Sequence, residues 1–214
     1  MPKFNKRSLI ISIVIIILLI ISILLFNPIR SLNSFQKHEK YPLYTMTYFG
    51  SYDYLTFTIP HSNKEMEKFS EYIPSNNQYV FLENQACTIF SATGGEDKIY
   101  GRNRDMGQQN IALLLVSDPP DGYASISMVD LNQFGVDPGS FSLSFRLRLL
   151  AAPLLPTEGM NEFGLTIAKA DVPINNMEDK PGKKALFFRT AMREVLDHAQ
   201  TTQEALDILD QLNI

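Results

Sequence analysis

The chain has 214 residues, a formal net charge of −4 and one cysteine. A single cysteine excludes an internal disulfide, and one cysteine with three scattered histidines makes a poor metal site, so we expect no metal and no other cofactor. Residues 87–214 carry eleven basic and seventeen acidic residues, which argues against a phosphate backbone and so against a nucleic-acid partner.

The first thirty residues differ in composition from the rest. Leu9 to Phe26 is a run of 18 residues of Leu, Ile, Val and Phe, interrupted by Ser12 and Ser22. A helix of that length spans about 27 Å, close to the roughly 30 Å of a bilayer's hydrocarbon core. Three Lys or Arg residues precede the run, which favours a cytoplasmic N-terminus.

The apolar run therefore predicts a single-pass anchor in the cell membrane, with the remaining residues outside the cytoplasm. Asn27-Pro28 is expected to end the helix, because proline lacks the backbone N–H and disfavours helix in the preceding residue. A cleaved signal peptide is the alternative, although the run lacks a small-x-small exit. The part outside the membrane is long enough for one domain with a core.

Strand patterns dominate the first part of this domain. Residues 31–40 are polar and predict a linker. Tyr44–Pro60 is rich in Tyr, Thr and Phe and predicts two strands joined by a turn at 50–53. A short helix is expected at 65–72.

The lone cysteine begins the next predicted strand. Thr93–Asp97 has turn chemistry and joins strands expected at 87–92 and 98–103. Such a hairpin brings Arg102 and Asp105 back alongside the cysteine.

Further strands are expected at residues 111–116, 123–129 and 165–168, the last after a turn at Asn161–Gly164. After these strands, the spacing of apolar residues changes from every second residue, typical of strands, to a period of 3.6 residues, typical of helices. Four apolar residues share one helix face: Phe188, Met192, Val195 and Ala199. Thr201–Glu204 is a capping box that starts a second helix with Ile208, Leu209 and Leu212 on its apolar side. Strands followed by helices predict an α+β fold, and the end at Ile214 suggests a fragment.

Four short motifs occur in order: Cys87-Thr88, Gly101–Asp105 (GRNRD), Gly159–Leu165 (GMNEFGL), and Arg193–Leu196 before Thr202–Ala205. In this order they resemble the choloylglycine hydrolase and acyl-coenzyme A:6-aminopenicillanic acid acyltransferase group of N-terminal-nucleophile (Ntn) hydrolases. No single motif is specific, but the set spans about residues 44–214.

The resemblance implies part of an Ntn-hydrolase αββα sandwich, preceded by the transmembrane helix. It also implies that the chain cuts its own Ala86–Cys87 bond. Residues 1–30 are then a cytoplasmic tip and anchor, 31–86 a linker and propeptide-like strands, and 87–214 the N-terminal part of the catalytic domain. The new α-amine can take the thiol's proton, because an α-amine and a thiol have similar pKa values.

The same resemblance assigns roles to four residues. Cys87 is the nucleophile, and Arg102 favours its thiolate by placing a positive charge near the sulfur. Asp105 accepts a hydrogen bond from the new α-amine. Asp171 stands where the family often has an Asn lining the oxyanion hole, a departure because a carboxylate donates only when protonated. The alternative is that Cys87 is a small buried hydrophobe and that Arg102 and Asp105 form a surface pair.

We therefore expect a hydrolase of linear (non-peptide) amide bonds in an N-acylated small molecule, acting through a thioester at Cys87 and anchored through residues 9–26. The resemblance suggests bile-salt conjugates, penicillin-type side-chain amides, N-acyl amino acids or fatty-acid amides. An acyltransferase and a truncated, non-catalytic, membrane-anchored binding module remain as alternatives, since the family's further Asn and Arg lie beyond Ile214. A homo-oligomer formed through the anchor is less favoured, because the run lacks small-xxx-small spacing.

Overall fold

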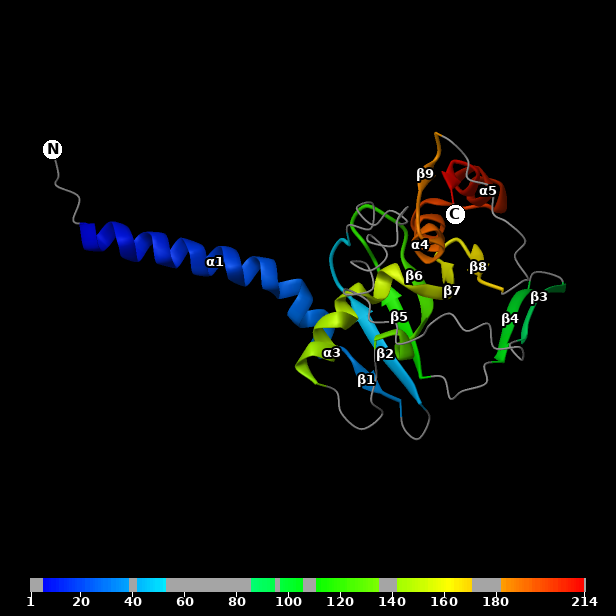
Figure 1. Ribbon diagram of the computed structural model, residues 1–214, viewed down its shortest axis with the longest axis horizontal. Coiled ribbons are helices and arrows are strands. Elements are labelled where there is room, and N and C mark those ends of the chain that lie inside the picture. Colours follow the sequence, from blue (N-terminus) through cyan, green and yellow to red (C-terminus); the bar gives the residue numbers. More distant parts are fainter. Residues whose placement is uncertain are drawn as a thin grey trace.

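A long helix and a six-stranded sheet organise the computed structural model of the chain (Figure 1). The structure describes residues 6–38, 42–52, 86–94, 97–105, 111–134, 142–170 and 182–213. Helices and strands are both present in these ranges, so the predicted α+β class is confirmed. The part of the predicted strand pair beyond Tyr52 and the helix expected at 65–72 lie outside the described residues.

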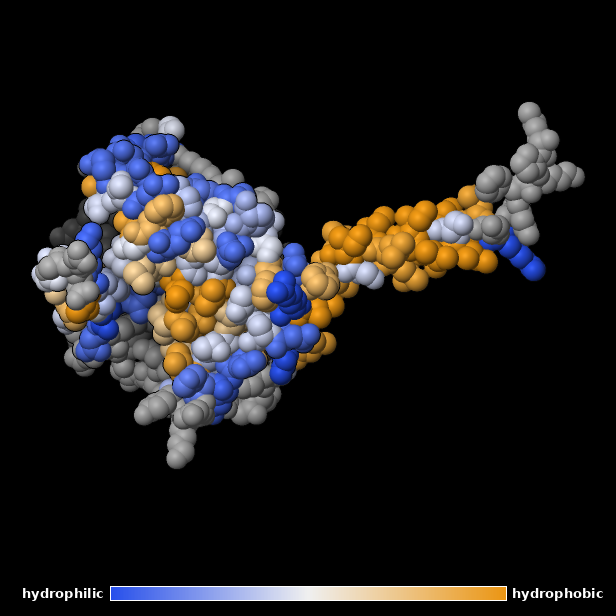
Figure 2. Space-filling model, turned by 180° about the vertical axis from the view of Figure 1, so that it is seen from behind, coloured by the Kyte–Doolittle hydropathy of each residue, from blue (hydrophilic) through white to orange (hydrophobic). Residues whose placement is uncertain are grey.

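The apolar run forms α1 (Lys6–Asn33), which extends away from the rest of the molecule (Figure 1). Figure 2 shows a hydrophobic surface along most of this helix. Within the described part of the chain, α1 is the one helix long and apolar enough to cross a membrane, and its apolar window is not buried against the domain.

The expected end of α1 at Asn27-Pro28 was wrong, because the helix continues through Pro28 to Asn33. Proline removes one backbone hydrogen bond, but the turns beyond it contact the domain. Ser31 Oγ donates to the Asn27 carbonyl at 2.8 Å and accepts from the Phe49 N–H at 2.9 Å. The contact with Phe49 joins the end of the helix to the domain.

The linker expected at 31–40 was also wrong where the structure describes it. Ser31 is fully buried, and Leu32 and Phe35 pack against the main core. The next residues form β1 (Gln36–Lys37), which pairs with the following strand. Apolar packing by Leu32 and Phe35 and hydrogen bonds of Ser34 with the Thr47 backbone therefore dock this polar segment on the domain.

The main sheet has the strand order β1-β2-β5-β6-β7-β8. The strands after β1 are β2 (Leu43–Tyr48), β5 (Ala112–Ser117), β6 (Ser125–Asp130), β7 (Pro156–Asn161) and β8 (Thr166–Ala168). β2 runs parallel to β5, whereas the other neighbours are antiparallel. The predicted strands at 111–116, 123–129 and 165–168 are thus confirmed within one or two residues.

Alternate residues of the central strands enter the core, as a period of two requires. Leu113 and Leu115 of β5, for example, are fully buried. Three short helical segments that the sequence did not predict contribute to the same region: η1 (Leu131–Phe134), α3 (Leu143–Arg148) and η2 (Leu149–Leu154).

Two C-terminal helices were predicted correctly. α4 (Phe188–His198) buries most of the apolar face expected for it and packs against β7. α5 (Thr202–Asp210) begins at the predicted cap, where the Thr201 hydroxyl accepts from the Glu204 N–H at 3.3 Å. The Glu204 carboxylate in turn accepts at 2.7 Å from the N–H of Gln200, one residue before the N-cap.

Leu212 lies beyond α5 rather than on its apolar face. It belongs to β10 (Leu212–Asn213), which pairs in parallel with β9 (Lys184–Ala185). Its side chain joins a small buried cluster with Leu186 and Ala191. The C-cap of α5 is Gln211, so the helix ends before Leu212.

Candidate active site

A hairpin carries the cysteine. β3 (Ala86–Gly94) and β4 (Asp97–Asp105) form their own two-stranded antiparallel sheet, which confirms the predicted hairpin (Figure 1). The register pairs Ile89 with Arg102, and Cys87 lies two residues before Ile89. Because paired residues share a face and alternate residues return to it, Cys87 and Arg102 lie on the same face.

Arg102 contacts the sulfur and the main sheet at once. Its Nη2 donates to Cys87 Sγ at 3.8 Å. Its Nη1 donates to Glu158 Oε2 at 2.7 Å and to the Thr157 carbonyl at 2.8 Å, while Nη2 also donates to the Lys169 carbonyl. The Arg102 side chain is only 4% exposed, whereas Cys87 is half-buried. Three groups on β7 and just after β8 therefore fix a cation against the sulfur.

The surroundings of Arg102 keep it charged. Burial lowers the pKa of the guanidinium, but the hydrogen bond and charge of Glu158, with a smaller effect of Cys87, outweigh burial and raise that pKa above its ordinary value. The site therefore keeps a permanent positive charge beside the sulfur.

The other two predicted site residues are described less fully. Asp105 ends β4 opposite Ala86, so its backbone lies beside the Ala86–Cys87 bond. Its side chain lies outside the described part of the structure, and its contact with an α-amine stays a prediction. Asp171 lies outside the described residues, and its role stays a prediction as well.

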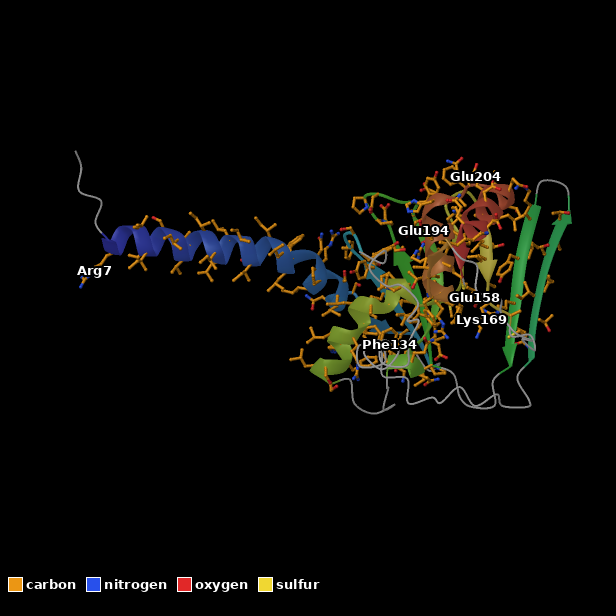
Figure 3. The ribbon with its side chains drawn as sticks, turned by 45° about the horizontal axis from the view of Figure 1, so that its top comes forward. Arg7, Phe134, Glu158, Lys169, Glu194 and Glu204 are labelled. Carbon is orange, nitrogen blue, oxygen red and sulfur yellow. The ribbon has the colours of Figure 1, made fainter. Side chains whose placement is uncertain are left out.

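Glu158 is a site residue that the sequence analysis did not identify. It lies on β7, is half-buried, and forms the ion pair with Arg102. Figure 3 shows Glu158 and Lys169 on the side of the sheet that faces the hairpin. The one available signal was the position of Glu158 directly before Gly159 in the GMNEFGL motif.

Tyr100 brings a further polar atom to this region. It lies two residues before Arg102 on β4 and so on the same face. Burial raises the pKa of its hydroxyl, the charge of Glu158 raises it further, and Arg102 opposes both. Its Oη is buried and finds no hydrogen-bond partner among the described residues. Tyr100 therefore places a buried, neutral hydroxyl beside the Arg102–Glu158 pair.

An apolar row crosses the sheet next to Glu158. The register pairs Val116 with Ile126 and Ile126 with Met160. These side chains are 39%, 46% and 46% exposed, and Met160 follows Glu158 by two residues on β7. The row thus lies on the same face as the ion pair. Figure 2 shows hydrophobic side chains gathered on the middle of the body, bordered by hydrophilic ones.

Asn161 of the GMNEFGL motif has a structural role, in agreement with its interpretation as a turn residue. Its Nδ2 donates to the carbonyls of Leu196 and Ala199 at 3.1 and 2.6 Å, at the C-terminal end of α4. Its Oδ1 accepts from the N–H groups of Phe163 and Leu165, both at 3.1 Å. One buried amide therefore fixes the turn between β7 and β8 and joins it to the helix.

A second buried cation lies on α4. Arg193 is fully buried, and its Nη2 contacts Asp197 Oδ1 at 2.7 Å and Ser125 Oγ at 2.6 Å. The Tyr52 hydroxyl donates to the same Asp197 oxygen at 2.9 Å. This cluster joins the helix to the sheet and to the segment after β2.

The described residues contain no group of His, Cys, Asp and Glu side chains that could hold a metal ion. Comparisons with protein-family models, with curated proteins and with solved structures found no match for this chain.

Proposed function

We propose that the chain is a hydrolase of linear amide bonds with an N-terminal-nucleophile mechanism, in which Cys87 attacks the acyl carbon. The observation that carries this proposal is the contact of Arg102 Nη2 with Cys87 Sγ at 3.8 Å, while the other terminal nitrogen of Arg102 donates to Glu158. A buried, permanently charged guanidinium aimed at a half-buried sulfur suits an activated nucleophile better than a core cysteine. The partial Ntn-hydrolase sandwich is part of the same proposal.

Maturation would begin with attack of Cys87 Sγ on the carbonyl carbon of Ala86. The carbon–nitrogen bond between these residues breaks, the nitrogen takes the thiol's proton and becomes the α-amine of Cys87, and the acyl group stays on sulfur as a thioester. Water then hydrolyses the thioester, which leaves a carboxylate on Ala86 and restores the thiol. Cleavage of the peptide bond thus yields the Ala86 carboxylate and the Cys87 α-amine, and the steps require only water.

The mature residue would treat a substrate amide in the same way. The α-amine takes the proton of the thiol, the sulfur attacks the acyl carbon, and the proton passes to the leaving amine as the carbon–nitrogen bond breaks. Water hydrolyses the acyl-enzyme to the free acid. Arg102 holds a positive charge beside the sulfur before attack.

The substrate that fits these surroundings is an N-acylated small molecule with an apolar acyl group. The row of Val116, Ile126 and Met160 begins beside the Arg102–Glu158 pair and offers an exposed apolar surface to the acyl chain. We further propose that α1 holds the protein in the cell membrane as a single-pass anchor with the site outside the cytoplasm, since basic residues precede its apolar run.

The test is the intact mass of the purified full chain, beside Cys87→Ala and Cys87→Ser. We expect a wild-type product that begins at Cys87, an uncut alanine variant, and slow cutting of the serine variant, because a hydroxyl is a weaker nucleophile than a thiolate. Ser91→Ala, on the same face of β3, is the matched control and should be cut like the wild type.

An uncut wild-type chain would refute self-maturation for this chain and would favour the membrane-anchored binding module. Cutting that persists in Cys87→Ala would assign the cleavage to another protease. The second reaction is tested on the cut protein with a set of N-acyl amides of increasing acyl length, by release of the free acid.

A further inference from the structure

The folded domain begins directly where the apolar run of α1 ends. Asn27, the first residue after the run, lies against Gly50, where an added Cβ would meet Asn27 Nδ2 at 2.9 Å. One turn further, the Arg30 guanidinium lies 3.6 Å from the centre of the Phe49 ring, and Ser31 Oγ accepts from the Phe49 N–H. The last turns of α1 are therefore packed on the domain and do not form a free stalk.

The length of this packed part sets the height of the domain above a bilayer. Residues 27–33 of α1 rise by about 10 Å beyond the apolar run. The headgroup layer on each side of the hydrocarbon core is about 5–8 Å thick. When the apolar run lies in the hydrocarbon core, the turns that contact the domain lie in the headgroup layer. The surface of the domain beside α1 then meets lipid.

α3 is the helix that lies beside this end of α1 (Figure 1). Its inner face is held by Phe145, which is 2% exposed and meets the Phe35 ring edge-on at 6.2 Å between ring centroids. Phe35 lies just beyond the end of α1. Leu149, one turn after Phe145 at the start of η2, is fully buried, and η2 contacts α1. These contacts fix α3 against the base of α1.

The outer face of α3 is apolar as well. Leu143 and Leu147, one turn apart, share this face and are 73% and 53% exposed. A surface helix of a soluble domain normally directs polar residues outward, so a second apolar face indicates a second apolar environment. The last turn of α3 is basic, and Arg30 is exposed at the end of α1. Positive charge beside apolar side chains suits a layer that contains anionic headgroups.

We propose that Leu143 and Leu147 of α3 lie in the headgroup layer of the membrane that α1 spans, and that they hold the domain on the bilayer in one orientation. The proposal rests on the proposed anchor and is independent of self-cleavage. In this orientation the β3–β4 hairpin lies at the end of the molecule away from α1 (Figure 1, Figure 3). The Cys87 site is thereby held away from the bilayer, which favours a substrate amide that is dissolved in water.

Lipid-borne quenchers measure the depth of single residues and so test the proposal. The full chain carrying Cys87→Ala receives one new cysteine, which is labelled with a polarity-sensitive fluorophore. The protein is reconstituted into vesicles of phosphatidylcholine and phosphatidylglycerol, in which some lipids carry a nitroxide either near the headgroup or at the end of the acyl chain. Because Cys87→Ala removes the native thiol and the nucleophile, the result does not depend on the cut.

Four labelled positions give the expected pattern. Leu147→Cys should be quenched by the nitroxide near the headgroup. Leu206→Cys is the matched control, because Leu206 of α5 is 55% exposed and α5 lies on the side away from α1, so its label should stay unquenched. Ile16→Cys, in the middle of the apolar run, should be quenched by the acyl-chain nitroxide and reports the anchor. Ile99→Cys of β4 should stay unquenched and reports the orientation of the hairpin.

Each departure from this pattern has a separate meaning. Quenching at Ile16 without quenching at Leu147 would overturn the docking of α3 and leave the anchor standing. An unquenched Ile16 label would refute the anchor and the docking together. A Leu147 label with blue-shifted emission that no lipid nitroxide quenches would assign this face to a second copy of the chain and overturn the proposal. Quenching at Ile99 would contradict the orientation.

The two leucines are then tested with a reporter on the same helix. Ser144→Cys, at an exposed position between them, carries the label, and the double change Leu143→Gln with Leu147→Gln should abolish its quenching. Leu206→Gln should leave the quenching of this reporter unchanged. Equal quenching with and without the leucines would mean that α1 alone brings α3 to the lipid, which would overturn their role.

Discussion

Glu158 of β7 accepts a 2.7 Å hydrogen bond from Arg102 of β4, and this ion pair joins the hairpin to the main sheet. The same guanidinium contacts Cys87 through its other terminal nitrogen. Glu158 is therefore a positioning residue: it acts on the sulfur through Arg102. The Thr157 carbonyl accepts from Nη1 and the Lys169 carbonyl from Nη2, so the sheet, rather than the hairpin alone, sets the place of the cation.

Glu158→Gln tests this positioning role. The amide keeps the size and an acceptor but loses the charge that raises the Arg102 pKa. We expect self-cleavage to slow by about tenfold, which corresponds to about 1.4 kcal/mol in the barrier. Glu162→Gln is the matched control, because Glu162 lies on the exposed turn after β7 and its contact with the Ala124 N–H can be kept by a glutamine oxygen. Equal rates for both variants would contradict the role of Glu158.

Alkylation tests whether Arg102 activates the sulfur. In Arg102→Met the sulfur loses the adjacent positive charge, and we expect iodoacetamide to modify Cys87 about tenfold more slowly at neutral pH, because only the thiolate reacts. Arg102→Lys should recover part of the rate, since it restores a charge but not the planar group with several donors. The single cysteine makes the intact mass a direct readout.

Arg146→Met is the control for this experiment, because Arg146 lies on the exposed surface of α3. An unchanged alkylation rate in Arg102→Met would mean that the 3.8 Å contact does not activate the thiol. The interpretation of Cys87 as an ordinary half-buried side chain would then gain support.

The local part of this site could be predicted from the sequence. Turn residues between two strand-like segments determine a hairpin, and a hairpin places Arg102 beside Cys87 whatever the rest of the fold does. The groups that hold Arg102 could not be predicted in this way. They lie 55, 56 and 67 residues further along the chain, and two of them are backbone carbonyls, which carry no sequence signal.

The same distinction explains the error at the end of α1. Local chemistry correctly identifies Asn27-Pro28 as a poor helical pair. The contact that sustains the helix beyond it is with Phe49, whose N–H donates to Ser31 Oγ and whose ring lies 3.6 Å from the Arg30 guanidinium. Tertiary packing of this kind outweighs a local preference. It cannot be predicted from the local sequence, because the contact forms only when β2 has folded beside the helix end.

Asp197→Ala tests the buried cluster on α4. The substitution leaves the fully buried Arg193 without its carboxylate partner, and the loss of one member of a buried ion pair costs about 3–5 kcal/mol. Urea unfolding of the detergent-solubilised chain measures the free energy, followed by far-ultraviolet circular dichroism because the chain has no tryptophan. Asp207→Ala on the exposed side of α5 should cost less than about 0.5 kcal/mol. Similar costs for the two variants would rule out a dominant role for the buried pair.

Alkaline pH should weaken the contact between residues 42–52 and the domain through Tyr52. Burial raises the pKa of the Tyr52 hydroxyl, and the neighbouring Asp197 raises it further against the opposing effect of Arg193. The unfolded chain releases the phenolic proton above about pH 10, whereas the native state keeps it. The native state then holds more protons, so the free energy of unfolding falls as the pH rises, by up to about 1.4 kcal/mol per pH unit from this group.

Tyr52→Phe removes that contribution and should give a shallower decline above about pH 10. The variant also loses the hydrogen bond with Asp197, which lowers its stability by about 1 kcal/mol near neutral pH. The two effects can be distinguished by pH. The lost hydrogen bond lowers the free energy of unfolding already at neutral pH, whereas the titration changes it only at alkaline pH. Burial also raises the pKa values of Tyr48 and Tyr100. The free energy of unfolding of the variant should therefore still decline somewhat at alkaline pH. Parallel curves of unfolding free energy against pH for wild type and Tyr52→Phe would show that Tyr52 does not stay protonated in the native state.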